Sequence, residues 1–180
     1  MKKLFTFFFG LMGWKSILNE AIPPKCVLCI APHASNWDFV IGFIFYKSIG
    51  GTIRFLIKKE WFFFPMNLLL KSLGGIPVDR KKRSSVSEQM VDLFRADDHF
   101  RLAVTPEGTR KRSAAWKTGF YYIALNAPAP ITLAYIDYSH KEIGVIKNFY
   151  PTGNEKHDVA EIKQYYAHIQ AKHPDRFTIN

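Results

Sequence analysis

Short apolar runs rich in branched residues alternate with amphipathic stretches along most of this chain. Strands that alternate with helices indicate crossover connections and therefore a mostly parallel sheet. The last two strands are separated by a short turn at 139–141, so they are expected to pair antiparallel. The sequence therefore predicts a single α/β domain with a largely parallel central sheet, flanking helices and a terminal antiparallel strand pair. The expected strands are 26–32, 52–58, 76–78, 102–105, 131–138 and 142–149, and the expected helices are 39–48, 67–72, 84–96, 114–126 and 158–173.

The composition fits one folded domain with a sizeable core. The chain has 180 residues, of which 48% are hydrophobic and 16% aromatic, and disorder is not expected at that level. Its formal net charge of +10 indicates an anionic partner. Nucleic acid, an anionic membrane surface, an acidic carrier protein and a phosphorylated substrate all satisfy that requirement, and composition does not choose among them.

Two cysteines have the C-x-x-C spacing of redox and metal sites. Cys26 and Cys29 fall within an expected buried strand, where residues three apart point to opposite faces. No second C-x-x-C pair completes a zinc site. We therefore expect two small buried hydrophobes here and no bound metal.

The first twenty residues are expected to form an amphipathic helix at a membrane surface, with residues 21–180 as the main domain. After two lysines, residues 4–14 are nearly all apolar, but the run is far shorter than the ~20 residues that span a bilayer. No small-residue cleavage site of a signal peptide follows it. An ordinary helix packed on the domain is the alternative. The aromatic run 61–64 is expected on the same membrane-facing side.

A histidine and an aspartate five positions apart stand between two apolar runs, in the segment 32–39. His33 can move a proton near neutral pH, and Asp38 can fix its tautomer and stabilise its charged form. Ser35 and Asp38 also fit a capping box at the start of a helix. The two interpretations are compatible. Because no nucleophile of the chain stands beside them, we expect the substrate to bring its own hydroxyl group.

A second segment, 105–110, has the features of a phosphate-binding loop. Gly108 lets the backbone approach a ligand, and Thr109 and Arg110 supply a hydroxyl and a guanidinium. Glu107 would repel a phosphate, so it needs a partner and is expected to orient the loop. A solvated turn with a basic rim is the alternative. Arg80 stands in a further basic loop, at 78–83.

These three loops each follow an expected strand, namely 26–32, 76–78 and 102–105. In parallel sheets, ligands bind where loops leave the carboxyl ends of the strands. We therefore expect a groove at that edge, with His33 facing the loop that carries Thr109 and Arg110.

Four blocks in this order resemble the glycerolipid acyltransferase superfamily, the lysophosphatidate acyltransferases in particular. They are His33 with Asp38, the glycine-led segment 75–80 ending in Arg80, the Pro-Glu-Gly-Thr-Arg loop 106–110, and the apolar strand that starts at 129–131. The resemblance covers about residues 26–136.

The resemblance implies acyl transfer from a thioester, acyl-CoA or acyl carrier protein, to the free hydroxyl of a lysophospholipid, with 1-acyl-sn-glycerol-3-phosphate as the default acceptor. His33 would be the general base and Asp38 would orient it. The acceptor site would comprise Arg80, Glu107, Gly108, Thr109 and Arg110, and the strand after residue 130 would line the acyl or acceptor channel. No metal or cofactor is implied.

We expect a peripheral enzyme at the cytoplasmic face of the inner membrane, with the membrane surface as a partner and no nucleic acid. Three other functions remain alternatives at this stage. They are a non-catalytic module that binds lipids or membranes, a nucleic-acid-binding protein suggested by charge alone, and a metal hydrolase. An acyltransferase acting on another lyso-lipid is also open.

Overall fold

The computed structural model describes residues 2–79, 86–113 and 115–179. Within them, one sheet has the strand order β1-β7-β6-β2-β5-β3-β4. Only β6 and β7 pair antiparallel, and every other neighbouring pair is parallel. The predicted fold class is confirmed. The strands are β1 (Lys15–Leu18), β2 (Cys26–Ile30), β3 (Arg54–Lys58), β4 (Gly75–Val78), β5 (Arg101–Val104), β6 (Ile131–Asp137) and β7 (Glu142–Phe149).

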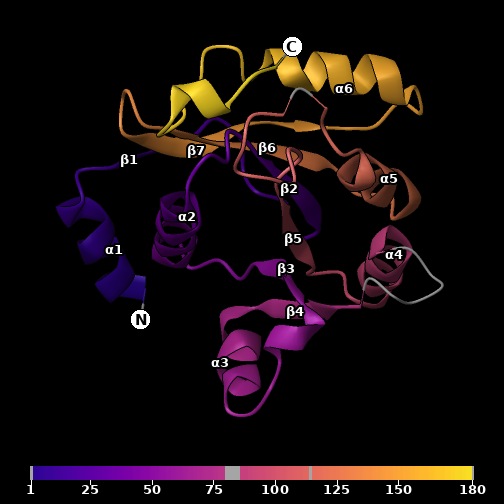
Figure 1. Ribbon diagram of the computed structural model, residues 1–180, viewed down its shortest axis with the longest axis horizontal. Helices are drawn as coiled ribbons and strands as arrows, with labels where there is room; N and C mark the ends of the chain where they lie inside the picture. Colours follow the sequence, from indigo (N-terminus) through magenta and orange to yellow (C-terminus); the bar gives the residue numbers. More distant parts are fainter. Residues whose placement is uncertain (1, 80–85, 114, 180) are drawn as a thin grey trace.

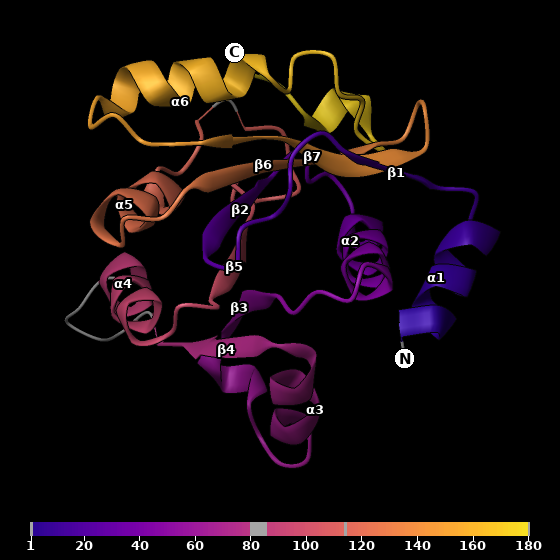
Figure 2. The same ribbon diagram turned by 180° about the vertical axis from the view of Figure 1, so that it is seen from behind.

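Helices cover both faces of this sheet (Figure 1, Figure 2). On one face lies α2, with α1 packed outside it, and on the other lie α4, α5 and α6. The shorter α3 stands beside β4, at the opposite end of the sheet from β1. The helices are α1 (Lys2–Leu11), α2 (Asn36–Ser48), α3 (Met66–Leu73), α4 (Val86–Ala96), α5 (Gly119–Asn126) and α6 (Glu155–Gln164), with 3-10 turns at Lys59–Trp61 and Pro174–Arg176.

The two cysteines show how β2 divides the core. Cys29 belongs to the large cluster under α4, α5 and α6, whereas Cys26 packs with Leu28 and Tyr46 on the α2 side. Both thiols are fully buried, and burial raises the pKa of Cys26 to about 11. The interpretation of these cysteines as small buried hydrophobes on opposite faces is confirmed.

The amino-terminal region differs from the expectation in its extent. The helix within residues 1–20 covers only Lys2–Leu11, and β1 then adds an edge strand to the sheet. This strand was not predicted, because four residues at an edge carry too short an alternation to recognise. Gly144 lets β1 approach, since a Cβ there would collide with the carbonyl oxygen of Ile17.

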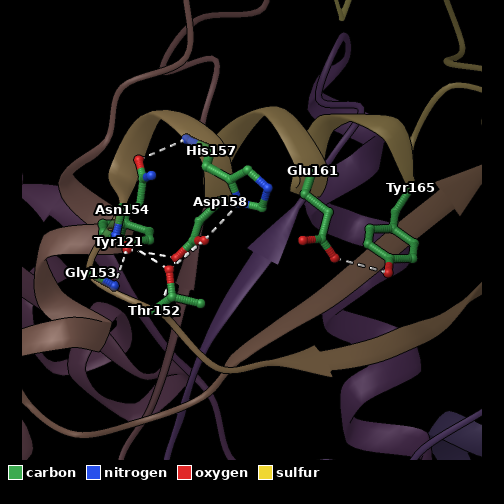
Figure 3. A network of polar contacts seen from close by, with 8 residues as sticks. All are labelled: Tyr121, Thr152, Gly153, Asn154, His157, Asp158, Glu161 and Tyr165. Carbon is green, nitrogen blue, oxygen red and sulfur yellow. Dashed lines mark hydrogen bonds and ion pairs between the residues drawn. The ribbon is translucent and has the colours of Figure 1, made fainter.

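The last helix also has other bounds than the expected 158–173. It begins at Glu155, because the side chain of Asn154 caps it by accepting a hydrogen bond from the backbone N–H of His157, and it ends at Gln164. Behind its first turn, Asp158 is fully buried. This carboxylate accepts hydrogen bonds from the Tyr121 hydroxyl at 2.7 Å and from Thr152, which ties α6 to α5 (Figure 3).

Within the described part of the chain, none of the helices combines the length and the apolar character that crossing a bilayer needs.

Candidate active site

The loop between β2 and α2 holds His33 at the carboxyl end of the central strand, and the first turn of α2 holds Asp38. Ser35 caps α2: its hydroxyl accepts a hydrogen bond from the backbone N–H of Trp37, and Asp38 reaches back to accept one from the backbone N–H of Ser35 at 2.8 Å. The capping box is therefore present. It fixes the position of Asp38 in the first helical turn.

The same carboxylate meets the histidine. Oδ2 of Asp38 lies 3.4 Å from Nδ1 of His33, so both interpretations of the segment hold at once. Asp38 is only 4% exposed. Its burial alone would raise the pKa, but hydrogen bonds from His33, Tyr138 and Ser35 outweigh burial and lower the pKa of Asp38 below its ordinary value. The carboxylate is thus charged and ready to stabilise an imidazolium.

Glu107 joins this loop to the segment 105–110. Its Oε1 accepts a hydrogen bond of 3.0 Å from the backbone N–H of His33. The expectation that Glu107 needs a partner is met by this backbone amide. The side chain is 4% exposed, and burial raises its pKa to about 6. A buried glutamate therefore connects the two loops directly behind the histidine.

The phosphate-loop candidate is shaped by one glycine and one lysine. Gly108 has φ of +62°, a left-handed conformation that favours glycine. A Cβ there would lie 2.8 Å from the side chain of Lys117. The backbone N–H of Lys117 donates a hydrogen bond of 2.7 Å to the carbonyl of Pro106, so a second cation is held against the loop.

A cavity of about 820 Å³ opens beside these groups, within the ~300–1,000 Å³ typical of small-molecule sites. Most of its wall is apolar and comes from α2, the sheet and α3. This one cavity is also lined by His33, Asp38, Arg110 and Lys117. The predicted meeting of the histidine loop with the Arg110 loop is therefore observed.

Not every predicted residue reaches this cavity. Gly108 lines it, but Thr109 does not, and the Thr109 hydroxyl instead accepts a hydrogen bond from the backbone N–H of Lys111. Glu107 lies behind the cavity wall. Arg80 falls outside the described residues, so its phosphate contact stays a prediction. The strand after residue 130 lines the cavity through Ala134, Tyr135 and Ile136.

Sequence reasoning missed two residues of this site. Lys117 belongs to none of the motifs, and its place in the cavity follows from the turn that precedes α5. Tyr138 donates a hydrogen bond of 2.7 Å from its hydroxyl to Oδ1 of Asp38. Nothing local in the sequence links these two residues, because they lie 100 positions apart.

The arrangement can take a proton from a bound group and hold an anion nearby. Nδ1 of His33 faces Asp38, which leaves Nε2 to accept a proton from a substrate. Arg110 and Lys117 supply positive charge for an anionic group, and the apolar wall suits a long hydrocarbon. Among the described residues, no three His, Cys, Asp or Glu side chains gather as metal ligands do.

Comparisons with known proteins agree with this description. A family model described as acyltransferase matches residues 16–136. The probable 1-acyl-sn-glycerol-3-phosphate acyltransferase of Mycoplasma pneumoniae is 30% identical over 146 residues, which cover 72% of this chain and 52% of that protein. The 1-acyl-sn-glycerol-3-phosphate acyltransferase of Haemophilus influenzae is 30% identical over 143 residues, covering 76% of this chain and 58% of that protein. The chain thus spans a little over half the length of these relatives.

A solved structure shows the same fold. The crystal structure of the 1-acyl-sn-glycerophosphate acyltransferase of Thermotoga maritima superposes with a TM-score of 0.60 at 15% sequence identity, over 94% of this chain and 80% of that one.

Proposed function

This chain belongs to the acyltransferase family, and we propose that it moves a fatty acyl group from a thioester to the free hydroxyl of a lysophospholipid. The most suitable acceptor is 1-acyl-sn-glycerol-3-phosphate, the substrate in the names of two relatives. One observation carries the proposal. A histidine–aspartate pair and two cations line a single, mostly apolar cavity, so base, phosphate site and hydrocarbon site are adjacent.

His33 is the general base of this reaction. Nε2 of His33 takes the proton of the acceptor hydroxyl while the hydroxyl oxygen attacks the thioester carbonyl carbon. The tetrahedral intermediate then collapses, the carbon–sulfur bond breaks, and the imidazolium returns its proton to the thiolate. Asp38 holds Nδ1 and stabilises the imidazolium between these steps. A general base contributes about 10²–10⁴-fold to such a rate, which suffices with positioning because a thioester is already activated.

Arg110 and Lys117 are proposed to bind the phosphate of the acceptor. Both are exposed cations that line the cavity beside the histidine. A guanidinium can hold a phosphate through two parallel hydrogen bonds, and an ammonium adds a point charge. Gly108 leaves room for the side chain of Lys117. Thr109 and Glu107 keep the loop in place, and Arg80 is proposed as a further phosphate ligand.

The apolar part of the cavity is proposed to hold the acyl chain of the donor. Its wall includes Phe39 and Phe43 of α2 and Phe55 and Ile57 of β3. Acyl-CoA and an acidic acyl carrier protein are both anionic donors, which suits the net charge of +10. The proposed reaction uses no metal or redox cofactor.

A peripheral position at the cytoplasmic face of the inner membrane is part of the proposal. One face of α1 packs on α2 through Phe9, and the other face exposes large apolar side chains. A second exposed group lies on the segment that leads into α3 and on α3 itself. The side chains are Leu4, Phe7, Phe8 and Leu11 in the first group, and Trp61, Phe63, Phe64, Leu68 and Leu69 in the second. We name these two groups together the apolar patch and propose that both face the membrane.

Product analysis by mass spectrometry tests the proposed function. The purified full chain is incubated with a panel of lyso-lipids and with both acyl-CoA and acyl-carrier-protein donors. A diacyl product that carries a phosphate head group is expected, with 1-acyl-sn-glycerol-3-phosphate as the best acceptor. Binding to lipid vesicles without turnover on any donor would replace the enzyme with a non-catalytic membrane-binding module.

A further inference from the structure

We propose that Tyr138 is a positioning residue for the reaction, which acts by holding Asp38 in the orientation that His33 requires. The inference rests on the proposed function. It goes beyond the histidine–aspartate pair, because it assigns the second oxygen of the carboxylate to a hydroxyl donor from a distant part of the chain.

The carboxylate of Asp38 is held on both of its oxygens. Oδ2 lies 3.4 Å from Nδ1 of His33 and accepts the Ser35 backbone N–H at 2.8 Å. Oδ1 accepts the Tyr138 hydroxyl at 2.7 Å. Rotation of the carboxylate about its Cβ–Cγ bond would therefore break contacts on both oxygens at once. The hydroxyl of Tyr138 adds the contact on Oδ1 and so strengthens the hold on the plane of the group.

Tyr138 is itself held by neighbours from two other segments, the one at Trp14 and the one at 170–172. Its backbone N–H donates a hydrogen bond of 3.0 Å to the carbonyl of Gln170. The ring of Trp14 meets its ring edge-on, with centroids 5.1 Å apart, and Nζ of Lys172 lies 6.0 Å from its centroid. Tyr138 also follows β6 directly, at the strand end that carries the site. A donor held this firmly can hold its acceptor.

The contact has an electrostatic consequence as well. The Tyr138 hydroxyl is one of the hydrogen bonds that keep the pKa of Asp38 low against the effect of burial. The other charged or titratable groups around the carboxylate and the tyrosine are His33, Glu107 and Lys172. Removing the hydroxyl therefore frees one oxygen and makes Asp38 easier to protonate.

The chain offers a matched control elsewhere in the fold. Tyr121 also donates its hydroxyl to a buried aspartate, Asp158, at 2.7 Å. That pair belongs to the network that ties α6 to α5 (Figure 3) and has no part in the proposed chemistry. Tyr121→Phe thus removes the same group from the same kind of partner, together with the hydrogen bond that the Tyr121 hydroxyl accepts from the backbone N–H of Gly153. It reports what the loss of such bonds does to stability away from the site.

The experiment compares Tyr138→Phe, Tyr121→Phe and the wild-type chain in three measurements. These are steady-state acyl transfer, thermal unfolding and the titration of Asp38 followed by carboxyl-carbon NMR. In Tyr138→Phe we expect kcat to fall about tenfold, the order of one hydrogen bond to a charged group, while KM for both substrates stays the same. The pKa of Asp38 rises. In Tyr121→Phe neither kcat nor the Asp38 titration changes, although the melting temperature falls.

A double-mutant cycle shows whether Tyr138 acts through Asp38. In an Asp38→Ala background, Tyr138→Phe is expected to have no further effect on kcat. An equal loss of kcat in both backgrounds would overturn the proposal, as would wild-type kcat and an unchanged Asp38 titration in Tyr138→Phe. If the wild-type chain transfers no acyl group, the proposed function fails, and the NMR titration still decides whether Tyr138 holds Asp38.

Discussion

Arg110 and Lys111 are neighbouring cations with different places in the structure, since only Arg110 lines the cavity. If Arg110 holds the acceptor phosphate, Arg110→Ala raises the acceptor KM by about ten- to a hundredfold, as loss of a charge-assisted hydrogen bond does. Lys111→Ala, which removes one exposed positive charge next door, should leave KM nearly unchanged. Steady-state kinetics at varied acceptor concentration measure both. Equal changes in the two variants would mean that general charge, and not a phosphate contact, attracts the acceptor.

The buried carboxylate of Glu107 links the two loops, and it is expected to lower the free energy of unfolding at neutral pH. Burial raises its pKa from 4.5 to about 6, so its folded state binds a proton more tightly than its unfolded state. This tighter proton binding stabilises the folded state fully below pH 4.5, and the stabilisation is lost as the pH rises through about 6. Glu107→Gln should therefore have a free energy of unfolding at pH 7 that is higher than that of the wild type by about 2 kcal/mol, measured by denaturant titration. This difference should vanish near pH 4.

Some contacts of the site could be predicted from the sequence, and others could not. The need of Glu107 for a partner and the double role of Asp38 followed from local chemistry. Asp38 meets His33 and Ser35 within one motif, whereas the partner of Glu107, the backbone of His33, lies 74 positions away and could not be named. The contact of Tyr138 did not follow from local chemistry, because its partner is 100 positions away. Only the register of β6 in the sheet brings the two together.

At the scale of elements, α2 and the sheet both line the cavity, and Gly42 adds no side chain to the wall that α2 forms. A Cβ at Gly42 would touch only Ile136, at 3.9 Å. Gly42→Ala should therefore leave the preference for acyl-chain length unchanged, whereas the larger side chain in Gly42→Leu fills the cavity. We expect the leucine variant to lose activity with long acyl donors and to keep it with short ones. Competition between donors of different chain length measures this, and an unchanged preference in Gly42→Leu would place the acyl chain elsewhere.

Most helices and strands were predictable from hydrophobic periodicity, because they are long enough to show a repeating pattern. The failures share a physical cause. β1 is a four-residue edge strand, and α5 begins at Gly119 and not near 114 because the chain first turns to place Lys117 on the Pro106 carbonyl. In both places tertiary contacts, and not local propensity, set the structure.

At the scale of the whole molecule, the apolar patch and the net charge of +10 favour an anionic lipid surface. Trp61 and Phe64 are 58% and 79% exposed, so replacing both with serine removes apolar area that a membrane would bury. We expect binding to anionic vesicles to fall at least about tenfold, and to weaken with salt for the wild type. Tyr150→Ser, at an equally exposed aromatic residue outside the patch, is the control. Equal binding of all three chains in flotation would remove the patch from the account.

The central claim concerns a single proton transfer at His33, and its most direct measurement is single-turnover acyl transfer by His33→Ala. The account predicts that transfer from the thioester to 1-acyl-sn-glycerol-3-phosphate falls by about 10²-fold or more, while circular dichroism and acceptor binding remain those of the wild type. A correctly folded His33→Ala variant that still forms product at close to the wild-type rate would contradict it.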